Sequence, residues 1–283
     1  MTDTEQKKHA QAFAAMHEGD DILVLPNAWD VISACVLVDA GFAAVATTSG
    51  GCAFALGYCD GEKIPLADMA GAVRNIAKAV PVPVSADMEA GYGPASEDVA
   101  ETTRQTLEAG AVGINIEDSD KRNPGHLLDF AVSVERIRAA RGVADAAGIP
   151  MVVNARTDGF HHGNDDEVFA ETVRRANAYL QAGAGCVFVP FVSDGALIGR
   201  LAAAIEGPMN VLAGPNTPAV PMLHELGVKR VTVGGNITKA AMTLVRRAAE
   251  ELLEQGTFEF SRDVYSQGDM HRMLTNPGGQ SKQ

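Results

Sequence analysis

The chain has 283 residues, 46% of them hydrophobic, and a formal net charge of −13. This length and apolar content suffice for one large core and favour a single α/β domain. The acidic balance and the lack of a basic run argue against nucleic-acid and anionic-membrane partners. A polar N-terminus, no apolar stretch long enough to span a bilayer, and four cysteines without metal-type or disulfide-framework spacing predict a cytoplasmic protein.

The predicted elements begin with a helical segment at residues 1–20. A repeated pattern follows, in which a helix-like segment closes on glycine, which supplies the left-handed C-cap, and a short apolar run begins. The runs that follow this pattern fall at residues 44–46, 113–116, 151–153, 186–189 and 230–233, and further apolar runs at 22–25, 82–86 and 209–212 bring the number to eight. They lack strict polar alternation, as expected of parallel strands that are buried on both faces.

Eight strand and helix units predict an α/β fold, a (β/α)8 TIM barrel formed as one domain over residues 1–283. An open doubly wound sheet is the rival architecture, but the Gly-x-Gly-x-x-Gly that it normally carries after the first strand is absent. The polar tail at residues 275–283 is predicted to be disordered.

Acidic side chains follow two neighbouring strands. Asp87 and Glu89 come after the third run, and Glu117 follows the fourth. Because the active site of barrel enzymes lies at the carboxyl ends of the strands, these acids are expected to share a site. Burying them is costly without a cation or hydrogen bonds, and oxygen ligands suit Mg²⁺, which takes one or two carboxylates directly. The alternative is ordinary N-capping of the following helices.

Other strand ends offer groups that can bind an organic acid. The second run leads into Ser49, Gly50 and Gly51, whose small side chains leave backbone N–H groups free to hold an anion. Arg156, after the fifth run, is either a bidentate carboxylate clamp or a salt-bridge partner of the acids. The remaining substrate-binding candidates at the strand ends are Trp29, Asp87 and Asn210.

These motifs resemble the isocitrate lyase and phosphoenolpyruvate mutase superfamily from about Leu23 to Leu252. The matching segments are Thr48–Gly51, Asp60, Asp87–Gly93, Ile116–Asp118 and Ala155–Arg156. The resemblance implies a barrel whose last helix is exchanged between subunits of a homotetramer or dimer, so that residues of about 240–270 pack on a neighbour. It also implies Mg²⁺, or Mn²⁺, held directly or through water by four positions, and a 2-oxo or 2-hydroxy acid bound by Ser49, Gly50, Gly51 and Arg156. The four metal positions are Asp60, Asp87, Glu89 and Glu117.

The chain departs from the better-known branches of that superfamily. Their lyases carry a Lys-Lys/Arg-Cys-Gly-His lid, whereas residues 121–126 contain no cysteine. The mutase and phosphonopyruvate hydrolase branch has a lid asparagine, which Asn123 matches, but also a histidine after the sixth strand, where this chain has Val189-Pro190-Phe191. Glu89 replaces an aspartate, a variation compatible with members that act on small oxo-diacids such as oxaloacetate.

The leading functional hypothesis is a Mg²⁺-dependent lyase that cleaves a carbon–carbon bond in a small 2-oxo or 2-hydroxy dicarboxylate through a metal-stabilised enolate. Decarboxylation of oxaloacetate is its simplest version. Tyr92, Tyr58 or His126, which lies in the predicted lid at residues 119–126, would move the proton. Two alternatives remain: a phosphonopyruvate hydrolase or phosphoenolpyruvate mutase that uses Asn123, and a barrel that binds a 2-oxo acid without turning it over.

Overall fold

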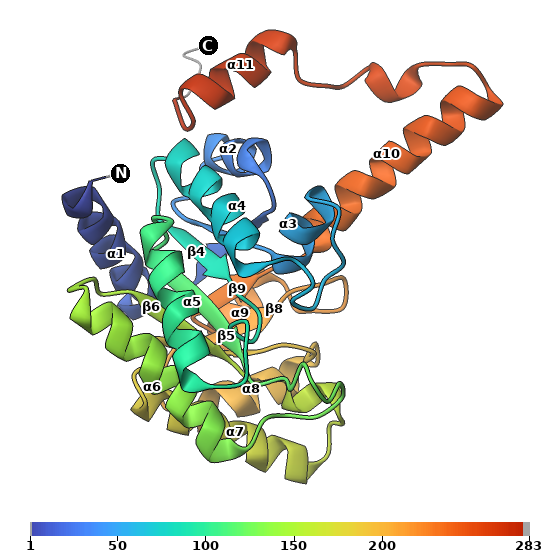
Figure 1. Ribbon diagram of the computed structural model, residues 1–283. Coiled ribbons are helices and arrows are strands. Elements are labelled where there is room, and N and C mark those ends of the chain that lie inside the picture. Colours follow the sequence, from blue (N-terminus) through green and yellow to red (C-terminus); the bar gives the residue numbers. More distant parts are fainter. Residues whose placement is uncertain (1, 280–283) are drawn as a thin grey trace.

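The computed structural model describes residues 2–279, which form a strand barrel surrounded by helices (Figure 1). The strands are β1 (Leu23–Leu25), β2 (Asn27–Ala28), β3 (Val45–Thr47), β4 (Val84–Asp87), β5 (Gly113–Glu117), β6 (Val152–Arg156), β7 (Cys186–Val189), β8 (Met209–Leu212) and β9 (Arg230–Thr232). The α-helices are α1 (Asp3–Glu18), α2 (Val31–Asp39), α3 (Ser49–Ala55), α4 (Leu66–Ala79), α5 (Ser96–Glu108), α6 (Phe130–Ala146), α7 (Asp166–Gln181), α8 (Gly195–Ala204), α9 (Val220–Glu225), α10 (Asn236–Glu254) and α11 (Gln267–Thr275). Two short 3-10 helices, η1 (Gly159–His161) and η2 (Glu259–Ser261), lie in the connections.

All strands of the described chain are parallel, in the order β1-β9-β8-β7-β6-β5-β4-β3-β2. β1 and β2 are two halves of one extended segment divided at Pro26, which has no N–H to donate. The first half pairs with β9 and the second with β3, so the segment closes the sheet. The Pro26 carbonyl still accepts a hydrogen bond from the Ala46 N–H at 2.8 Å. The predicted (β/α)8 barrel is therefore confirmed.

Glycine ends the helices where the sequence pattern places it. Gly110, after α5, and Gly183, after α7, have φ values of 96° and 103°, in the left-handed region that other residues avoid. Each is followed within a few residues by a buried strand. This spacing returns the chain to the barrel after α5 and α7, and parallel pairing sets the carboxyl ends of all strands at one rim.

The opposite end of the barrel is closed by α1. Phe13 is fully buried, and a Cβ on Gly113 at the start of β5 would lie 2.7 Å from its ring. The ring of His17, one turn later in the same helix, packs edge-on against Phe13 with centroids 4.8 Å apart. This N-terminal helix therefore forms the floor of the barrel.

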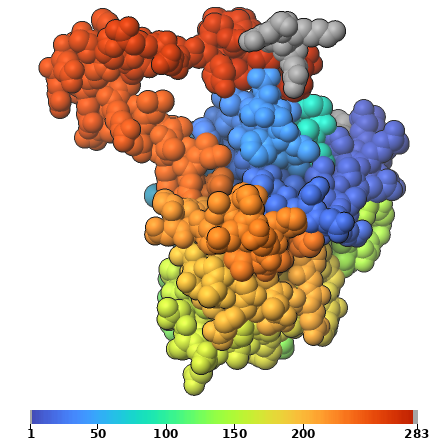
Figure 2. Space-filling model, turned by 180° about the vertical axis from the view of Figure 1, so that it is seen from behind, coloured from blue at the N-terminus to red at the C-terminus, as the bar shows by residue number. Residues whose placement is uncertain are grey.

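The C-terminal part leaves the barrel and returns to it. α10 projects away from the barrel, and the chain then folds back so that α11 lies beside α2 (Figures 1 and 2), where Arg272 pairs with Asp39. Large apolar side chains are exposed along this excursion: Met242, Leu244, Val245, Leu252, Leu253, Phe258, Phe260, Val264 and Tyr265. Of the tail predicted to be disordered, Thr275 ends α11, residues 276–279 follow it, and residues 280–283 lie outside the described part. No helix within residues 2–279 is long and apolar enough to cross a membrane.

Candidate functional site

A polar cavity of about 350 Å³ opens at the carboxyl rim of the barrel. The predicted residues that line it are Ser49, Gly50, Gly51, Asp60, Asp87, Arg156 and Asn210. A second cavity, of about 390 Å³, shares Asp60 and Arg156 with the first and is also lined by Glu117, Lys121 and His126. The structure therefore brings most of the predicted groups to one end of the barrel.

The N-terminus of α3 is fastened to the end of β4. The backbone N–H and hydroxyl of Ser49 donate to Asp87 Oδ2 at 3.0 and 2.8 Å, and the Asn115 amide donates to Asp87 Oδ1 at 3.0 Å. A Cβ on Gly50 would lie 3.0 Å from Asp60 Oδ2, and one on Gly51 only 2.7 Å from the Cβ of Trp29. Glycine is required at position 51, because the helix start packs directly on the Trp29 and Thr48 side chains, whereas a Cβ at position 50 would meet only the end of the exposed Asp60 side chain.

A lysine from the predicted lid lies between two of the predicted metal ligands. Lys121 Nζ is 2.6 Å from Glu117 Oε1 and 3.2 Å from Glu89 Oε2, and both carboxylates are buried. The Glu62 N–H also donates to both oxygens of Glu89, at 2.8 and 2.9 Å. Burial raises the pKa of Glu89 to about 7 despite Lys121. Burial also favours a higher pKa for Glu117, but the positive charges of Arg156 and Lys121 outweigh burial, so the pKa of Glu117 is lowered.

The guanidinium of Arg156 is held by carboxylates of the protein. It donates to Asp158 Oδ1 and Oδ2 at 2.5 and 3.0 Å, and its Nη1 lies 3.0 Å from Glu117 Oε2. The rings of Phe188 and Phe191 flank it, with centroids 5.6 and 5.7 Å from Cζ. The salt-bridge alternative for Arg156 is thus observed, while the side chain still lines both cavities.

Backbone strain concentrates at this rim. Within residues 2–279, the non-glycine residues with positive φ are Glu62, Glu89, Tyr92 and Phe191, at 57°, 51°, 60° and 65°. Such conformations cost about 1–3 kcal/mol each and persist where the surrounding structure imposes them, often at functional sites. Glu62 binds Glu89 and the Tyr92 N–H, and Phe191 lines both cavities. Sequence patterns did not single out Glu62, Lys121, Asp158 or Phe191.

Several predicted residues lie elsewhere. Tyr58 donates to Asp68 at 3.2 Å and lines a separate hollow beside α4, so its expected catalytic role is not supported. Trp29 packs beneath Gly51 without lining either rim cavity. The Tyr92 hydroxyl is buried without a hydrogen-bond partner among residues 2–279 and lies outside both cavity linings, as does exposed Asn123. These positions depend on loop direction, which the local sequence does not determine.

The acids fit a cation site without forming a closed cage. No group of three or more His, Cys, Asp or Glu side chains in the described chain is close enough to hold a metal ion by itself. Lys121 separates Glu89 from Glu117, and Asp60 is exposed. This donor set is compatible with Mg²⁺, which keeps several waters and takes few carboxylates directly. The ammonium between buried glutamates shows that the pair already accommodates positive charge.

Sequence comparisons identify relatives over most of the chain. A 2-methylisocitrate lyase of Escherichia coli (strain K12) is 30% identical over 207 residues, covering 70% of this chain and 68% of that protein. An uncharacterised protein of Mycobacterium tuberculosis (strain ATCC 25618 / H37Rv) is 33% identical over 240 residues, covering 84% and 87%.

Solved structures also resemble this chain over most of its length. A candidate lyase/mutase from Burkholderia cenocepacia J2315 has a TM-score of 0.89 and 39% identity, covering 96% of this chain and 98% of that one. A 2,3-dimethylmalate lyase has a TM-score of 0.82 and 28% identity, with 94% of each chain covered. An oxaloacetate acetylhydrolase, with a TM-score of 0.86 but 22% identity and 95% and 94% coverage, shows the shared fold alone.

The family assignment follows from the length of the match. A family model described as phosphoenolpyruvate phosphomutase matches residues 13–253, which include the whole barrel and most of α10. The relatives named above include lyases of the same superfamily. The chain belongs to the phosphoenolpyruvate phosphomutase family and is an enzyme of the isocitrate lyase/phosphoenolpyruvate mutase superfamily.

Proposed function

We propose that this enzyme is a Mg²⁺-dependent lyase that cleaves a carbon–carbon bond in a small 2-oxo or 2-hydroxy dicarboxylate. The observation that carries the proposal is the pair Glu89 and Glu117, which holds the Lys121 ammonium. Glu117 also pairs with Arg156, and both line the second rim cavity. The names of the related 2-methylisocitrate lyase and 2,3-dimethylmalate lyase support the reaction class. Decarboxylation of oxaloacetate is the simplest reaction of this kind.

The acids at the rim would hold the metal. They are Asp60, Asp87, Glu89 and Glu117, acting directly or through water, with Mn²⁺ able to replace Mg²⁺. The bound metal would supply Lewis-acid stabilisation of the negative charge that develops on the substrate oxygen as the bond breaks. Asp87 is held in place for this role by Ser49 and Asn115.

The substrate would be oriented by groups that line the first cavity. The N–H groups of Gly50 and Gly51 lie in the first turn of α3, where no preceding carbonyl of that helix accepts them, so they are available to a carboxylate. Arg156 adds positive charge from the other side of the rim, and Asn210 adds an amide donor. Together these groups favour a substrate with at least one carboxylate beside its oxo or hydroxyl group.

The proton that replaces the lost group would come from His126. This imidazole lines the second cavity together with Lys121 and Arg156, whereas Tyr58 and the Tyr92 hydroxyl lie outside both cavities. An imidazolium can donate a proton to the carbon that becomes free. We therefore assign proton delivery to His126, which replaces the missing lid cysteine in this role.

The decisive experiment follows pyruvate formation from oxaloacetate with Mg²⁺, with EDTA, and in the Asp87→Ala variant. Enzyme-free Mg²⁺ must be run in parallel because the metal alone promotes decarboxylation. The proposal predicts catalysis above this background that both treatments abolish. Turnover that survives both EDTA and Asp87→Ala would contradict the proposal. Thermal stabilisation by 2-oxo acids without any product would indicate a binding protein instead.

One enzymic alternative is favoured by the description of the matching family, phosphoenolpyruvate phosphomutase. It is a phosphonopyruvate hydrolase or mutase in which Asn123 contacts the substrate. This alternative would be supported if the enzyme released phosphate or phosphoenolpyruvate from phosphonopyruvate and the Asn123→Ala variant did not. Against it, Asn123 is exposed outside both cavity linings, and Phe191 stands near the position of the expected histidine.

We further propose that α10 is exchanged between subunits of a homodimer or homotetramer. The exposed apolar side chains of the C-terminal excursion support this, because Leu253 is 87% exposed and Phe258 67% exposed on a segment that leaves the barrel. Contiguous apolar surface of this kind marks an interaction site in soluble proteins. The cytoplasmic location expected from the sequence stays a prediction.

A further inference from the structure

The barrel contains a buried arginine that the proposed reaction does not use. Arg230 begins β9 and is 2% exposed, which makes it one of the largest fully buried side chains. Its Cζ lies 5.9 Å from the centroid of the Phe13 ring, so the guanidinium sits above the floor formed by α1. The same residue lines the polar cavity that opens at the rim. The cavity therefore runs from the acids at the mouth to a guanidinium deep in the barrel.

This guanidinium lacks a protein partner for its buried donors. Nε and Nη1 are buried without a hydrogen-bond acceptor among residues 2–279, and the Ser85 hydroxyl that lines the same cavity is also unpartnered. Asp87 is the acid whose charge acts on Arg230, but its oxygens accept hydrogen bonds from Ser49 and Asn115. Buried charges are ordinarily paired, because an isolated ion in a low-dielectric interior is strongly unfavourable.

The positive charge of Arg230 persists at neutral pH. Burial lowers its pKa to about 10, which still leaves it protonated. The nearby His17 does not compensate for it and adds no charge, because burial and the Arg230 charge lower the pKa of His17 to about 4. The interior of the barrel near its floor thus holds a charged guanidinium that bonds no carboxylate, next to a polar cavity whose wall also includes Asp87.

We propose that the inner end of this cavity binds a small monovalent anion, of the size of chloride or bromide, on the guanidinium of Arg230 with the Ser85 hydroxyl as a further donor. One negative charge matches the single guanidinium, whose buried Nε and Nη1 have no hydrogen-bond acceptor among residues 2–279. A dianion would leave excess negative charge facing Asp87 and the acids at the rim. Its two donors are not among the proposed metal ligands, so the site stands whether or not the proposed reaction is correct.

Thermal unfolding in halide and gluconate salts at matched ionic strength tests the proposal. Chloride and bromide should raise the Tm of the unaltered enzyme saturably, by about 5 °C at 100 times the dissociation constant. Gluconate is too large for the site and should not raise the Tm. In Arg230→Met the halide effect should vanish, and in gluconate this variant should be at least as stable as the unaltered enzyme, because an unpaired buried charge has been removed.

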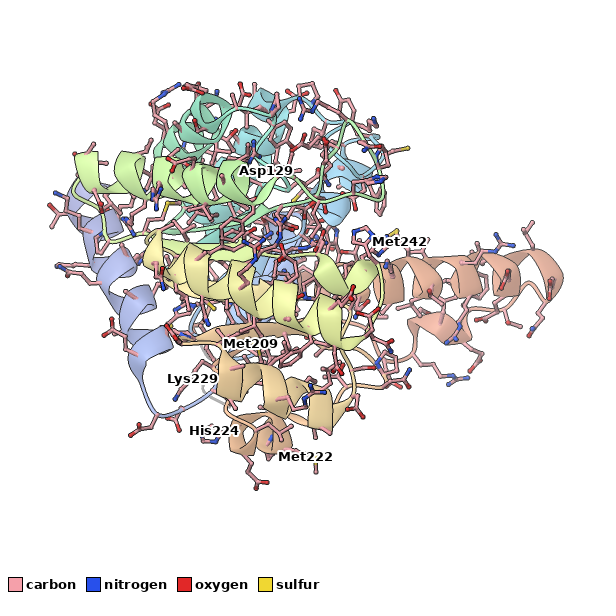
Figure 3. The ribbon with its side chains drawn as sticks, turned by 90° about the horizontal axis from the view of Figure 1, so that it is seen from below. Asp129, Met209, Met222, His224, Lys229 and Met242 are labelled. Atoms are coloured by element: carbon pink, nitrogen blue, oxygen red, sulfur yellow. The ribbon has the colours of Figure 1, made fainter. Side chains whose placement is uncertain are left out.

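The matched control is Lys229→Gln, which removes the adjacent positive charge outside the cavity. Lys229 donates to the Gly19 carbonyl at 3.1 Å, near the end of α1, and is labelled in Figure 3. This variant should keep the halide response. An equal rise of Tm in Arg230→Met would overturn the proposal, because it would reveal a general salt effect.

A direct measurement does not depend on the folding of any variant. Crystals of the unaltered enzyme soaked in bromide should give an anomalous peak within contact distance of the Arg230 guanidinium. Ordered water there, with no anomalous signal at saturating bromide, would overturn the proposal.

Discussion

Replacing Lys121 by methionine tests whether the lid ammonium stands where a divalent cation is held. Nζ lies 2.6 Å from Glu117 Oε1 and 3.2 Å from Glu89 Oε2, and the glutamate side chains are only 4% and 3% exposed. Removing one partner of a buried ion pair costs about 3–5 kcal/mol. Because the Lys121 side chain is 28% exposed, water screens part of the attraction, and we expect Lys121→Met to lose about 2–3 kcal/mol of unfolding free energy in EDTA.

Saturating Mg²⁺ should restore most of that loss, because the metal then compensates the same carboxylates. The variant should also bind Mg²⁺ about tenfold more tightly, equivalent to about 1.4 kcal/mol, since no ammonium has to be displaced. Urea unfolding with EDTA or Mg²⁺ and calorimetric titration measure the two effects. Lys63→Met is the matched control, because Lys63 lines the second cavity and forms no ion pair within the described chain. An identical stability loss in both buffers, with unchanged Mg²⁺ affinity, would refute the reasoning.

Three further perturbations have definite expected results. The pKa of buried His17 is lowered to about 4, so the unfolded chain binds more protons between pH 6.5 and 4. The free energy of unfolding therefore carries the full contribution of neutral His17 above pH 6.5 and falls by about 3 kcal/mol as the pH is lowered towards 4. In His17→Gln, denaturant unfolding should not show this fall. Gly51→Ala should lower both Tm and kcat/KM, because its Cβ would meet Trp29 at 2.7 Å, whereas Gly71→Ala, with nothing within 4 Å, should leave both intact or raise Tm slightly. Leu253→Asp should reduce the molar mass measured by light scattering if α10 is exchanged; an unchanged mass would count against that exchange.

The sequence predicted the barrel because its signals are local and repeated. Short apolar runs, five of them preceded by a glycine cap, mark the strand and helix units, and parallel pairing brings all carboxyl ends to one rim. Asp87 and Arg156 end their strands, so their positions at the rim follow directly from the fold. The division of the first strand at Pro26 was not predicted, because the apolar run before it already suggested a complete strand.

The loop residues were harder to place, for physical reasons. Lys121 and Tyr58 lie on irregular segments, where no helical or strand period determines the direction of a side chain. Lys121 turns inward because two buried glutamates attract it, and Tyr58 turns outward to Asp68. Arg230 is instead on a strand, but its burial without a partner depends on α1 closing the floor, which is a contact between distant parts of the chain.

The charges at the rim indicate an order of binding. The acids that line the two cavities are Asp60, Asp87, Glu117, Asp120 and Asp158, to which Glu89 is added, against the cations Lys63, Lys121, Arg156, Arg230 and Lys239. With every group ionised these six negative and five positive charges leave an excess of one negative charge, which a dicarboxylate would increase and Mg²⁺ would reverse. Protonation of Glu89, whose pKa is about 7, relieves only part of this excess at neutral pH. Metal binding should therefore precede substrate binding, and the KM for the dicarboxylate should fall as Mg²⁺ rises until the metal site is saturated. A KM that is independent of Mg²⁺ below saturation, with only kcat responding, would show that the acids do not govern substrate entry.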